Sequence, residues 1–285
     1  MNKRHHESLL ERTGISRRAW ITSMVVLALV YLMGIFLWGS FLNPETYAVH
    51  YENKFLHPSL SHPFGTDFMG RDMFFRSIKG LSTSLIIGVL AAVVSSLIAL
   101  FLGVVSAVYG GWVDKLVNLS IDLCMGLPHL VLLILISFMM GRGVRGVTVA
   151  VALTHWPSLS RMVRAEVLQI KSSQYVETSY KLGVSPWKVA FTHMVPHVLP
   201  VYFIGLMLLF PHAIMHEAAV TFLGFGLPAE IPSIGVILSE AMKHIVTGKW
   251  WLAVYPGLLL LAALMFFDSI GENLKKLLNP SSGNE

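Results

Sequence analysis

The chain has 285 residues, of which 54% are hydrophobic and 13% are charged, and its mean hydropathy is +0.65. A soluble domain carries about 25% charged residues, so this composition excludes an ordinary water-soluble fold and indicates a protein embedded in a lipid bilayer. The formal net charge of +5 fits basic loops that orient membrane helices, and because no basic cluster is interleaved with exposed aromatic residues, we expect no nucleic-acid partner.

The first apolar segment, about Trp20–Leu42, predicts a retained membrane anchor. It is long for the apolar core of a signal peptide, and no small-x-small cleavage site follows it. A membrane helix needs about 20 mostly apolar residues. Five further segments are candidates: about Leu81–Tyr109, Leu116–Met140, Val144–Leu159, His197–Phe225 and Trp251–Ile270. We therefore predict an all-α polytopic membrane protein with six transmembrane helices.

Helix-breaking residues interrupt three of these segments. Gly126 and Pro128 lie inside the third, and Pro157 ends the fourth. The fifth contains Pro200 and Pro211 and is expected to be kinked or split. Such breaks are tolerated in a helix bundle because neighbouring groups can satisfy the freed backbone carbonyls.

The distribution of basic residues predicts the orientation. If both termini are cytoplasmic, thirteen Lys and Arg residues fall on the inner side and eight on the outer side. Positively charged loops stay inside, so we predict a multi-pass protein with both termini in the cytoplasm.

The predicted cytoplasmic segment from Gln174 to Pro196 is too polar to span the membrane. Gly183 is a helix stop, and Ser185 followed by Pro186 predicts the start of a second helix, Trp187–Met194. We expect a helix-turn-helix with an apolar face and no core of its own, which favours docking into a groove of a partner protein. The alternative is an amphipathic hairpin lying on lipid headgroups, but the segment lacks a broad Lys/Arg-rich face.

This segment resembles the coupling motif of ABC importer permeases: Glu-Ala-Ala, three residues, Gly and, thirteen residues after that Gly, Pro. Glu177, Gly183 and Pro196 occupy those places, and Thr178 and Ser179 replace the two alanines. In this resemblance the ATPase-coupling residues of the chain are Glu177, Thr178, Ser179, Gly183, Trp187 and Pro196.

Two other segments resemble the peptide/nickel subfamily of these permeases: HPFGTDFMGRD (His62–Asp72) and EAAVTFLGFGLP (Glu217–Pro228). We interpret Arg71 and Asp72 as an outer-loop ion pair or a helix cap. The resemblance implies a type I ABC importer permease divided into a cytoplasmic N-terminal segment (1–19), a first helix with an outer loop (20–80), a permease core (81–271) containing coupling loop 172–196, and a cytoplasmic tail (272–285).

The sequence contains no G-x-x-x-x-G-K-[ST] phosphate loop, so the chain is predicted to be neither an ATPase nor an enzyme, with no cofactor of its own. The resemblance implies a bacterial inner-membrane complex in which ATP is used by partner subunits. The expected partners are a second homologous permease, one or two cytoplasmic ATP-binding subunits, an extracytoplasmic solute-binding protein and membrane lipids.

Histidines suggest what is carried, because ionisable groups at membrane depth are costly and mark pathways or helix contacts. His212 and His216 lie one helical turn apart on one face, with Met215 and Glu217 beside them. Imidazole is a good ligand for nickel, copper and zinc, and the pair resembles a His-x-x-x-His of nickel-type permeases. We favour a transition metal, nickel first, free or as a small chelate, with His212 and His216 as transient ligands and His155 on the same path.

Blander interpretations stay open. Buried histidines such as His129 and His155 commonly hydrogen-bond to carbonyl groups, and Glu217 either lines the path or fixes a helix interface. The main alternative cargo is a dipeptide or oligopeptide. An intramembrane metalloprotease is disfavoured because Val220 stands where an H-E-x-x-H motif starting at His216 needs its second histidine, and a carrier working alone has no use for an exposed hairpin.

Overall fold

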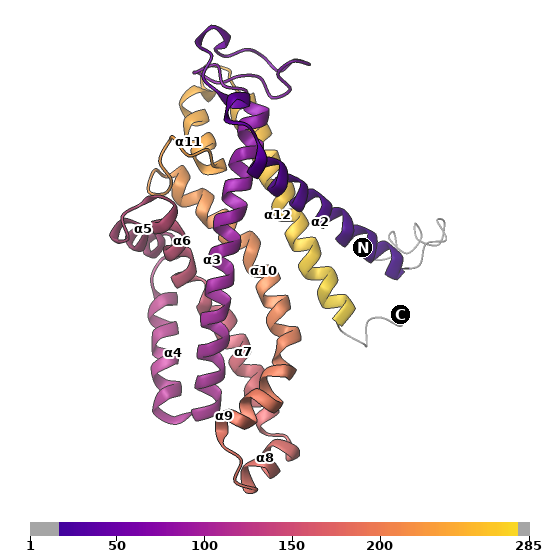
Figure 1. Cartoon of the computed structure of the whole chain (residues 1–285). Coiled ribbons are helices and arrows are strands. Elements are labelled where there is room, and N and C mark those ends of the chain that lie inside the picture. Colours follow the sequence, from indigo (N-terminus) through magenta and orange to yellow (C-terminus); the bar gives the residue numbers. More distant parts are fainter. Residues whose placement is uncertain (1–16, 279–285) are drawn as a thin grey trace, which may run out of the picture.

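Four helices in the computed structural model, which describes residues 17–278, are long and apolar enough to cross a membrane (Figure 1). They are α2 (Arg17–Phe41), α3 (Met73–Tyr109), the helical run that ends in α10 (Val195–Phe222), and α12 (Trp251–Leu278). The described chain is all-helical, as predicted. Most of the predicted N-terminal segment 1–19 and half of the predicted tail 272–285 lie outside the described residues, so those boundaries stay predictions.

By length and composition the described helices provide four to five membrane spans, one or two fewer than the six predicted. A fifth span exists only if α4 (Gly111–Gly126) and α5 (His129–Met139), which meet at 99°, count as one broken span. The predicted fourth helix is only α6 (Gly143–Thr154), with 12 residues, or about 18 Å. The chain bends at His155 and continues as the amphipathic α7 (Trp156–Lys171), which carries charge in every turn after its first.

Helix α10 is one continuous helix of 28 residues with Pro200 and Pro211 inside it, so the predicted split does not occur. Helix α3 begins earlier than predicted because Asp72 caps it: the Asp72 carboxylate accepts hydrogen bonds from the backbone N–H groups of Phe74 and Phe75. The helix-cap interpretation of Asp72 is thereby confirmed.

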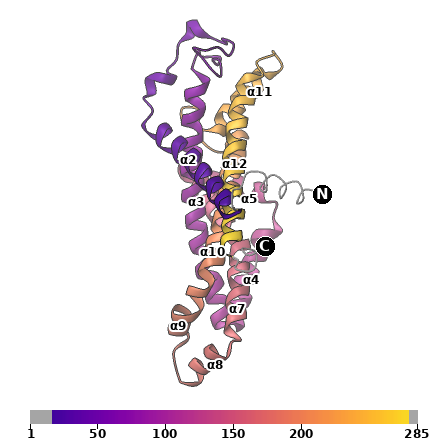
Figure 2. The same ribbon diagram turned by 90° about the vertical axis from the view of Figure 1, so that its right-hand side faces the viewer.

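Several short helices lie at the two ends of the molecule, whereas the short α5 lies near its middle (Figure 2). One end holds η1 (Pro44–Tyr47), η2 (Tyr51–Asn53) and α11 (Ile234–Ile245), and the opposite end holds α8 (Gln174–Lys181) and α9 (Pro186–Val189). Helix α11 was not predicted. Its signal was Ser233, whose side chain accepts a hydrogen bond from the Val236 N–H, followed by apolar residues on one face.

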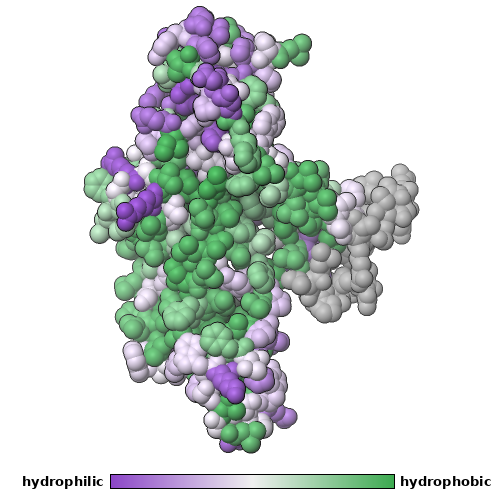
Figure 3. Space-filling model, in the orientation of Figure 1, coloured by the Kyte–Doolittle hydropathy of each residue, from purple (hydrophilic) through white to green (hydrophobic). Residues whose placement is uncertain are grey.

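Polar and apolar surface residues are separated between the two ends and the middle of the molecule. Figure 3 shows a broad apolar band over the middle of the molecule and polar residues at both ends. On α3 the outward side chains Leu90, Leu97 and Phe101 are more than half exposed within this chain. Such apolar exposure requires lipid or another membrane protein as its cover.

Helix α3 runs through the centre of the bundle and packs most closely on α7. At Gly103 an added Cβ would lie 2.8 Å from the Ser160 carbonyl oxygen and 2.8 Å from a Val163 methyl carbon. The absence of a side chain at Gly103 therefore sets the distance between the two helices, as small residues do in membrane bundles.

We predict that Gly103→Ala lowers stability by about 1–3 kcal/mol, because the new methyl group overpacks the α3–α7 contact. Thermal unfolding of the detergent-purified complex measures the change. Gly257→Ala on α12 is the matched control, since nothing in this chain lies within 4 Å of its added Cβ. An equal unfolding temperature for Gly103→Ala and the wild type would contradict the packing argument.

Candidate functional site

The hairpin of α8 and α9 projects from one end of the bundle (Figure 1). Gly183 ends α8 with φ of +77°. Its N–H donates to the Tyr180 carbonyl at 3.0 Å, and the Val184 N–H donates to the Ser179 carbonyl at 3.1 Å. This is the Schellman pattern of a helix C-terminus, which needs a left-handed residue. The stop predicted at Gly183 is confirmed.

The second half of the hairpin differs from the prediction. Helix α9 starts at Pro186, but the Ser185 side chain makes no capping hydrogen bond. Beyond Val189 the chain passes through a π-helical turn, η3 (Ala190–Met194), directly into α10. Pro196 therefore lies in the first turn of α10. The extra residue per turn of a π-helix lets the helix change direction without exposing its backbone.

The hairpin does bury part of its apolar face in its own chain, contrary to the prediction. Val189, Ala190 and Met194 are fully buried. Two aromatic residues of the same face stay partly outside this packing. The ring centroids of Trp187 and Tyr109 lie 5.7 Å apart, and Phe191 is 64% exposed. Through the buried residues the hairpin packs against α3, α7 and α10.

The tip of the hairpin presents a mixed surface. Leu182 is 78% exposed, and Glu177 pairs with Lys181 at 2.8 Å. The hydroxyl groups of Thr178 and Ser179 donate to carbonyls one turn earlier, at 2.8 and 2.9 Å. Because both hydroxyl groups are hydrogen-bonded within their own helix, these two residues offer small, neutral contact surfaces where the motif has alanines.

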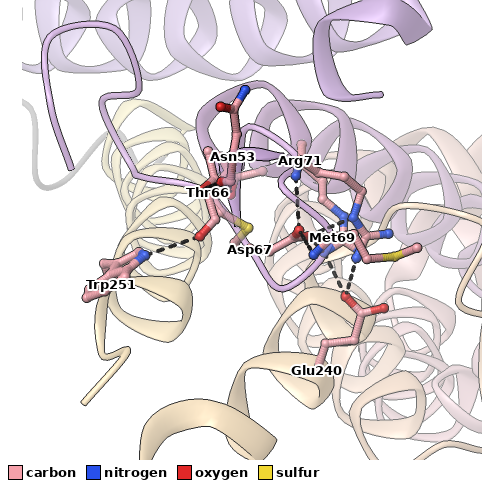
Figure 4. Close-up of polar contacts among 10 residues, drawn as sticks. Asn53, Thr66, Asp67, Met69, Arg71, Glu240 and Trp251 are labelled. Carbon is pink, nitrogen blue, oxygen red and sulfur yellow. Dashed lines mark hydrogen bonds and ion pairs between the residues drawn. The ribbon is translucent and has the colours of Figure 1, made fainter. Parts of the chain in front are cut away.

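At the opposite end, four charged groups hold the loop between α2 and α3 to α3 and α11 (Figure 4). Asp67 lies 2.6 Å from Arg71 and 3.0 Å from Arg76. Glu240 of α11 lies 3.0 Å from Arg71 and 2.7 Å from Arg76. Two acids and two bases thus alternate in a nearly dry site, in which Arg76 and Asp67 are each 2% exposed.

The ion-pair interpretation of Arg71 with Asp72 is corrected by this arrangement. Arg71 pairs with Asp67 and Glu240, whereas Asp72 caps α3 and pairs with the His62 ring at 2.7 Å. The residues of the segment HPFGTDFMGRD therefore have structural roles: they cap α3 and form the ion pairs that hold the loop in place. The Trp251 indole N–H, which lies 3.5 Å from the Thr66 carbonyl oxygen, ties the same loop to α12.

A cavity of about 350 Å³ opens between the broken helices and α10. Four histidines line it, His129, His155, His212 and His216, together with the sulfur-bearing Met125 and Met162. His129 is the first residue of α5, after the break at Gly126–Pro128, and His155 is the bend between α6 and α7. The helix breaks predicted from the sequence therefore place the rings of His129 and His155 facing α10.

The rings of three of these histidines are in mutual contact. The ring centroids lie 4.5 Å apart for His129 and His216, 4.8 Å apart for His129 and His155, and 5.1 Å apart for His155 and His216. His212 lines the same cavity, and its Nδ1 donates to the Leu208 carbonyl at 2.9 Å. The structure thus joins His216 to His155 and also to His129, which the sequence analysis did not place on the path.

Two predicted path residues do not line this cavity. Met215 is 43% exposed on another side of α10. Glu217 is fully buried and accepts a hydrogen bond at 3.0 Å from the Thr221 hydroxyl on the same helix. This placement favours the helix-interface interpretation of Glu217.

Comparison with known proteins identifies relatives of the whole chain. Residues 99–281 match the family described as "Binding-protein-dependent transport system inner membrane component". The dipeptide transport system permease protein of Bacillus subtilis (strain 168) is 32% identical over 261 residues, 91% of this chain and 81% of that protein. The oligopeptide transport system permease protein of the same organism is 31% identical and covers 93% of this chain and 86% of its own length.

The chain is also similar to a third permease protein in sequence and to a solved transporter structure in fold. The glutathione transport system permease protein of Pectobacterium atrosepticum is 29% identical over 89% of this chain and 85% of that protein. Among solved structures, an inward-facing form of the MetNI methionine ABC transporter superposes with a TM-score of 0.61. The alignment covers 73% of this chain and 98% of that one at 16% identity, a likeness of fold.

We predict that Asp67→Ala destabilises the packing of the α2–α3 loop on α3 and α11 by about 3 kcal/mol, because it leaves the buried Arg76 with only one acidic partner. Thermal unfolding of the purified complex and the rate of proteolysis of that loop measure the effect. Glu52→Ala is the control, since Glu52 makes only an exposed contact with His50. Equal stability of the Asp67→Ala and Glu52→Ala variants would contradict the role of the network.

Proposed function

Because the chain belongs to the family of inner-membrane components of binding-protein-dependent transport systems, we propose that it forms the translocation path for small peptides or peptide-like compounds. It is a multi-pass, transmembrane subunit of an ABC importer in the inner membrane and works with ATPase and binding-protein components. It has the all-helical permease fold and no catalytic activity, and ATP is hydrolysed by its partners.

The peptide class of cargo rests on the relatives. Those named above carry dipeptides, oligopeptides or glutathione according to their names, and each aligns with nearly the whole chain. This reverses the order of the two cargo hypotheses drawn from the sequence, which placed nickel before peptides. A cavity of about 350 Å³ has room for a compound of dipeptide size.

Nickel or another transition metal, free or as a small chelate, is the second candidate cargo. The specific observation in its favour is the set of four histidines on the wall of the cavity. Those side chains supply soft to borderline nitrogen ligands, which a path for ordinary peptides does not require.

The hairpin of α8 and α9 is proposed as the coupling element that docks in the cytoplasmic ATPase subunits. Its exposed tip, including Leu182, sits on a base fixed by the buried Val189 and Met194. Closure of the ATPases would therefore be transmitted to α10 and α3 as a rigid movement, in an alternating-access cycle. In this arrangement both termini are cytoplasmic, and a second permease covers part of the apolar band.

We predict that Gly183→Val weakens ATPase docking by about 5–30-fold and lowers uptake with it. A left-handed conformation costs a residue with a side chain about 1–2 kcal/mol, and no atom within 4 Å would meet the new Cβ, so the penalty is in the backbone. Co-purification of the ATPases and uptake measure the effect. Gly183→Asn is the control because Asn tolerates a positive φ. Normal docking and uptake in Gly183→Val would count against the coupling role.

We predict that the reconstituted importer, with its binding protein, takes up a labelled dipeptide in an ATP-dependent and saturable manner. The same proteoliposomes assayed with radioactive nickel test the second candidate. A complex with an ATPase-deficient partner is the control and should accumulate neither compound. Uptake of nickel without uptake of any dipeptide would replace the first cargo by the second.

A further inference from the structure

Three imidazole rings from distant parts of the chain meet at one place in the cavity. His129 begins α5, His155 joins α6 to α7, and His216 lies on α10. One ring nitrogen of each residue lies within 4.8 Å of the ring nitrogens of the other two. Within residues 17–278 this is the one group of three or more His, Cys, Asp or Glu side chains close enough to hold an ion.

The hydrogen bond of His155 decides which of its nitrogens is available. Its Nδ1 lies 2.9 Å from the Val151 carbonyl oxygen. A carbonyl oxygen only accepts, so Nδ1 carries the hydrogen, and in the neutral ring Nε2 holds the lone pair. That Nε2 is buried without a hydrogen-bond partner. Metal-binding histidines are oriented in this way, by a carbonyl on the opposite nitrogen.

The other two rings also present unpaired nitrogens. Nε2 of His129 and Nδ1 of His216 are buried and have no hydrogen-bond partner. Buried polar atoms are normally paired, and each exception calls for an explanation such as a bound ion. Each of the three clustered rings thus has one unpaired nitrogen, and a single cation that accepts a lone pair from each ring would explain all three.

We propose that His129, His155 and His216 bind one divalent transition-metal ion of the nickel, cobalt or zinc type. Neutral imidazole is the preferred nitrogen ligand of these ions. A metal–nitrogen distance of about 2.0–2.1 Å places tetrahedral ligands about 3.3 Å apart, so the three rings draw together on binding. The ion arrives either bare or held by a small chelator that leaves coordination positions open.

The number of ligands suits a site that releases its ion. Three protein ligands leave at least one coordination position open toward the cavity, whereas a closed four-ligand cage holds its metal permanently. His212 lies one turn from His216 and lines the same cavity. It offers a further imidazole to an ion that leaves the cluster.

This inference rests on the proposed function only in placing the cluster on the translocation path. It also reconciles the two cargo classes, because a six-coordinate ion bound to a peptide through its amino and amide groups would still have open coordination positions for the three histidines. The cargo would then be peptide-like in size and backbone and metal-dependent in its contact with the permease.

The whole importer, purified and stripped of metal, is titrated with cobalt chloride and followed by the absorption bands of four-coordinate cobalt. Nickel chloride is titrated by calorimetry. We expect one ion per chain. His155→Ala, His129→Asn and His216→Asn should each weaken binding at least about tenfold, since even changes outside the ligand set cost that much. His197→Ala, at an exposed position of the same α10, should bind as the wild type does.

The proposal is overturned if the wild type binds neither cobalt, nickel nor the nickel–diglycine complex stoichiometrically, or if the variants that assemble bind as the wild type does. The two Asn variants keep a polar side chain, so they stand if His155→Ala fails to fold. Binding of nickel chloride alone supports a bare ion, and binding only of a preformed nickel–diglycine complex supports a chelate. Dipeptide uptake by the same preparation tests the proposed function separately: an importer that carries dipeptide but binds no metal overturns only this inference.

Discussion

A backbone N–H or carbonyl group cannot be left unpaired in hydrocarbon, and this constraint shapes the rest of the molecule. Most of the chain meets it with long helices such as α3 and α10. Where the helix is interrupted, at Gly126–Pro128 and at His155, the breaks are packed against α10 and line a cavity. Irregular backbone is tolerated at such depth only in surroundings of this kind, so the places where a helix breaks are also the places where polar side chains collect.

The two ends of the molecule solve a different problem, because each must hold its shape outside the apolar band. At the end opposite the hairpin, Asp67, Arg71, Arg76 and Glu240 neutralise one another and fix the loop between α2 and α3, whose Phe55 and Phe64 also pack against the buried cluster around Trp251. At the hairpin end the burial of Val189, Ala190 and Met194 does the same work with apolar contacts.

The cargo is where sequence relatives and side-chain chemistry point in different directions. Overall similarity reflects the scaffold that many importers share, and it follows the peptide permeases. The histidine cluster is a local feature that overall identity hardly registers, since it involves three residues in 285. Function resides in sites placed on a fold rather than in the fold itself, so the cluster carries information that identity does not. A metal-bearing, peptide-like cargo satisfies both observations.

The sequence by itself determined the class of protein, the long apolar helices, the breaks at Gly126–Pro128 and near Pro157, and the stop at Gly183. Each of these follows from local chemistry: apolar length, proline's missing N–H and glycine's access to positive φ. Only the tertiary structure decided that α6 is too short to span, that Arg71 pairs with Glu240, 169 residues away, and that His216 meets His129 and His155 as well as its sequence neighbour His212. These depend on which helix faces pack together, and local periodicity shows that a helix has a face without showing which distant residue lies opposite it.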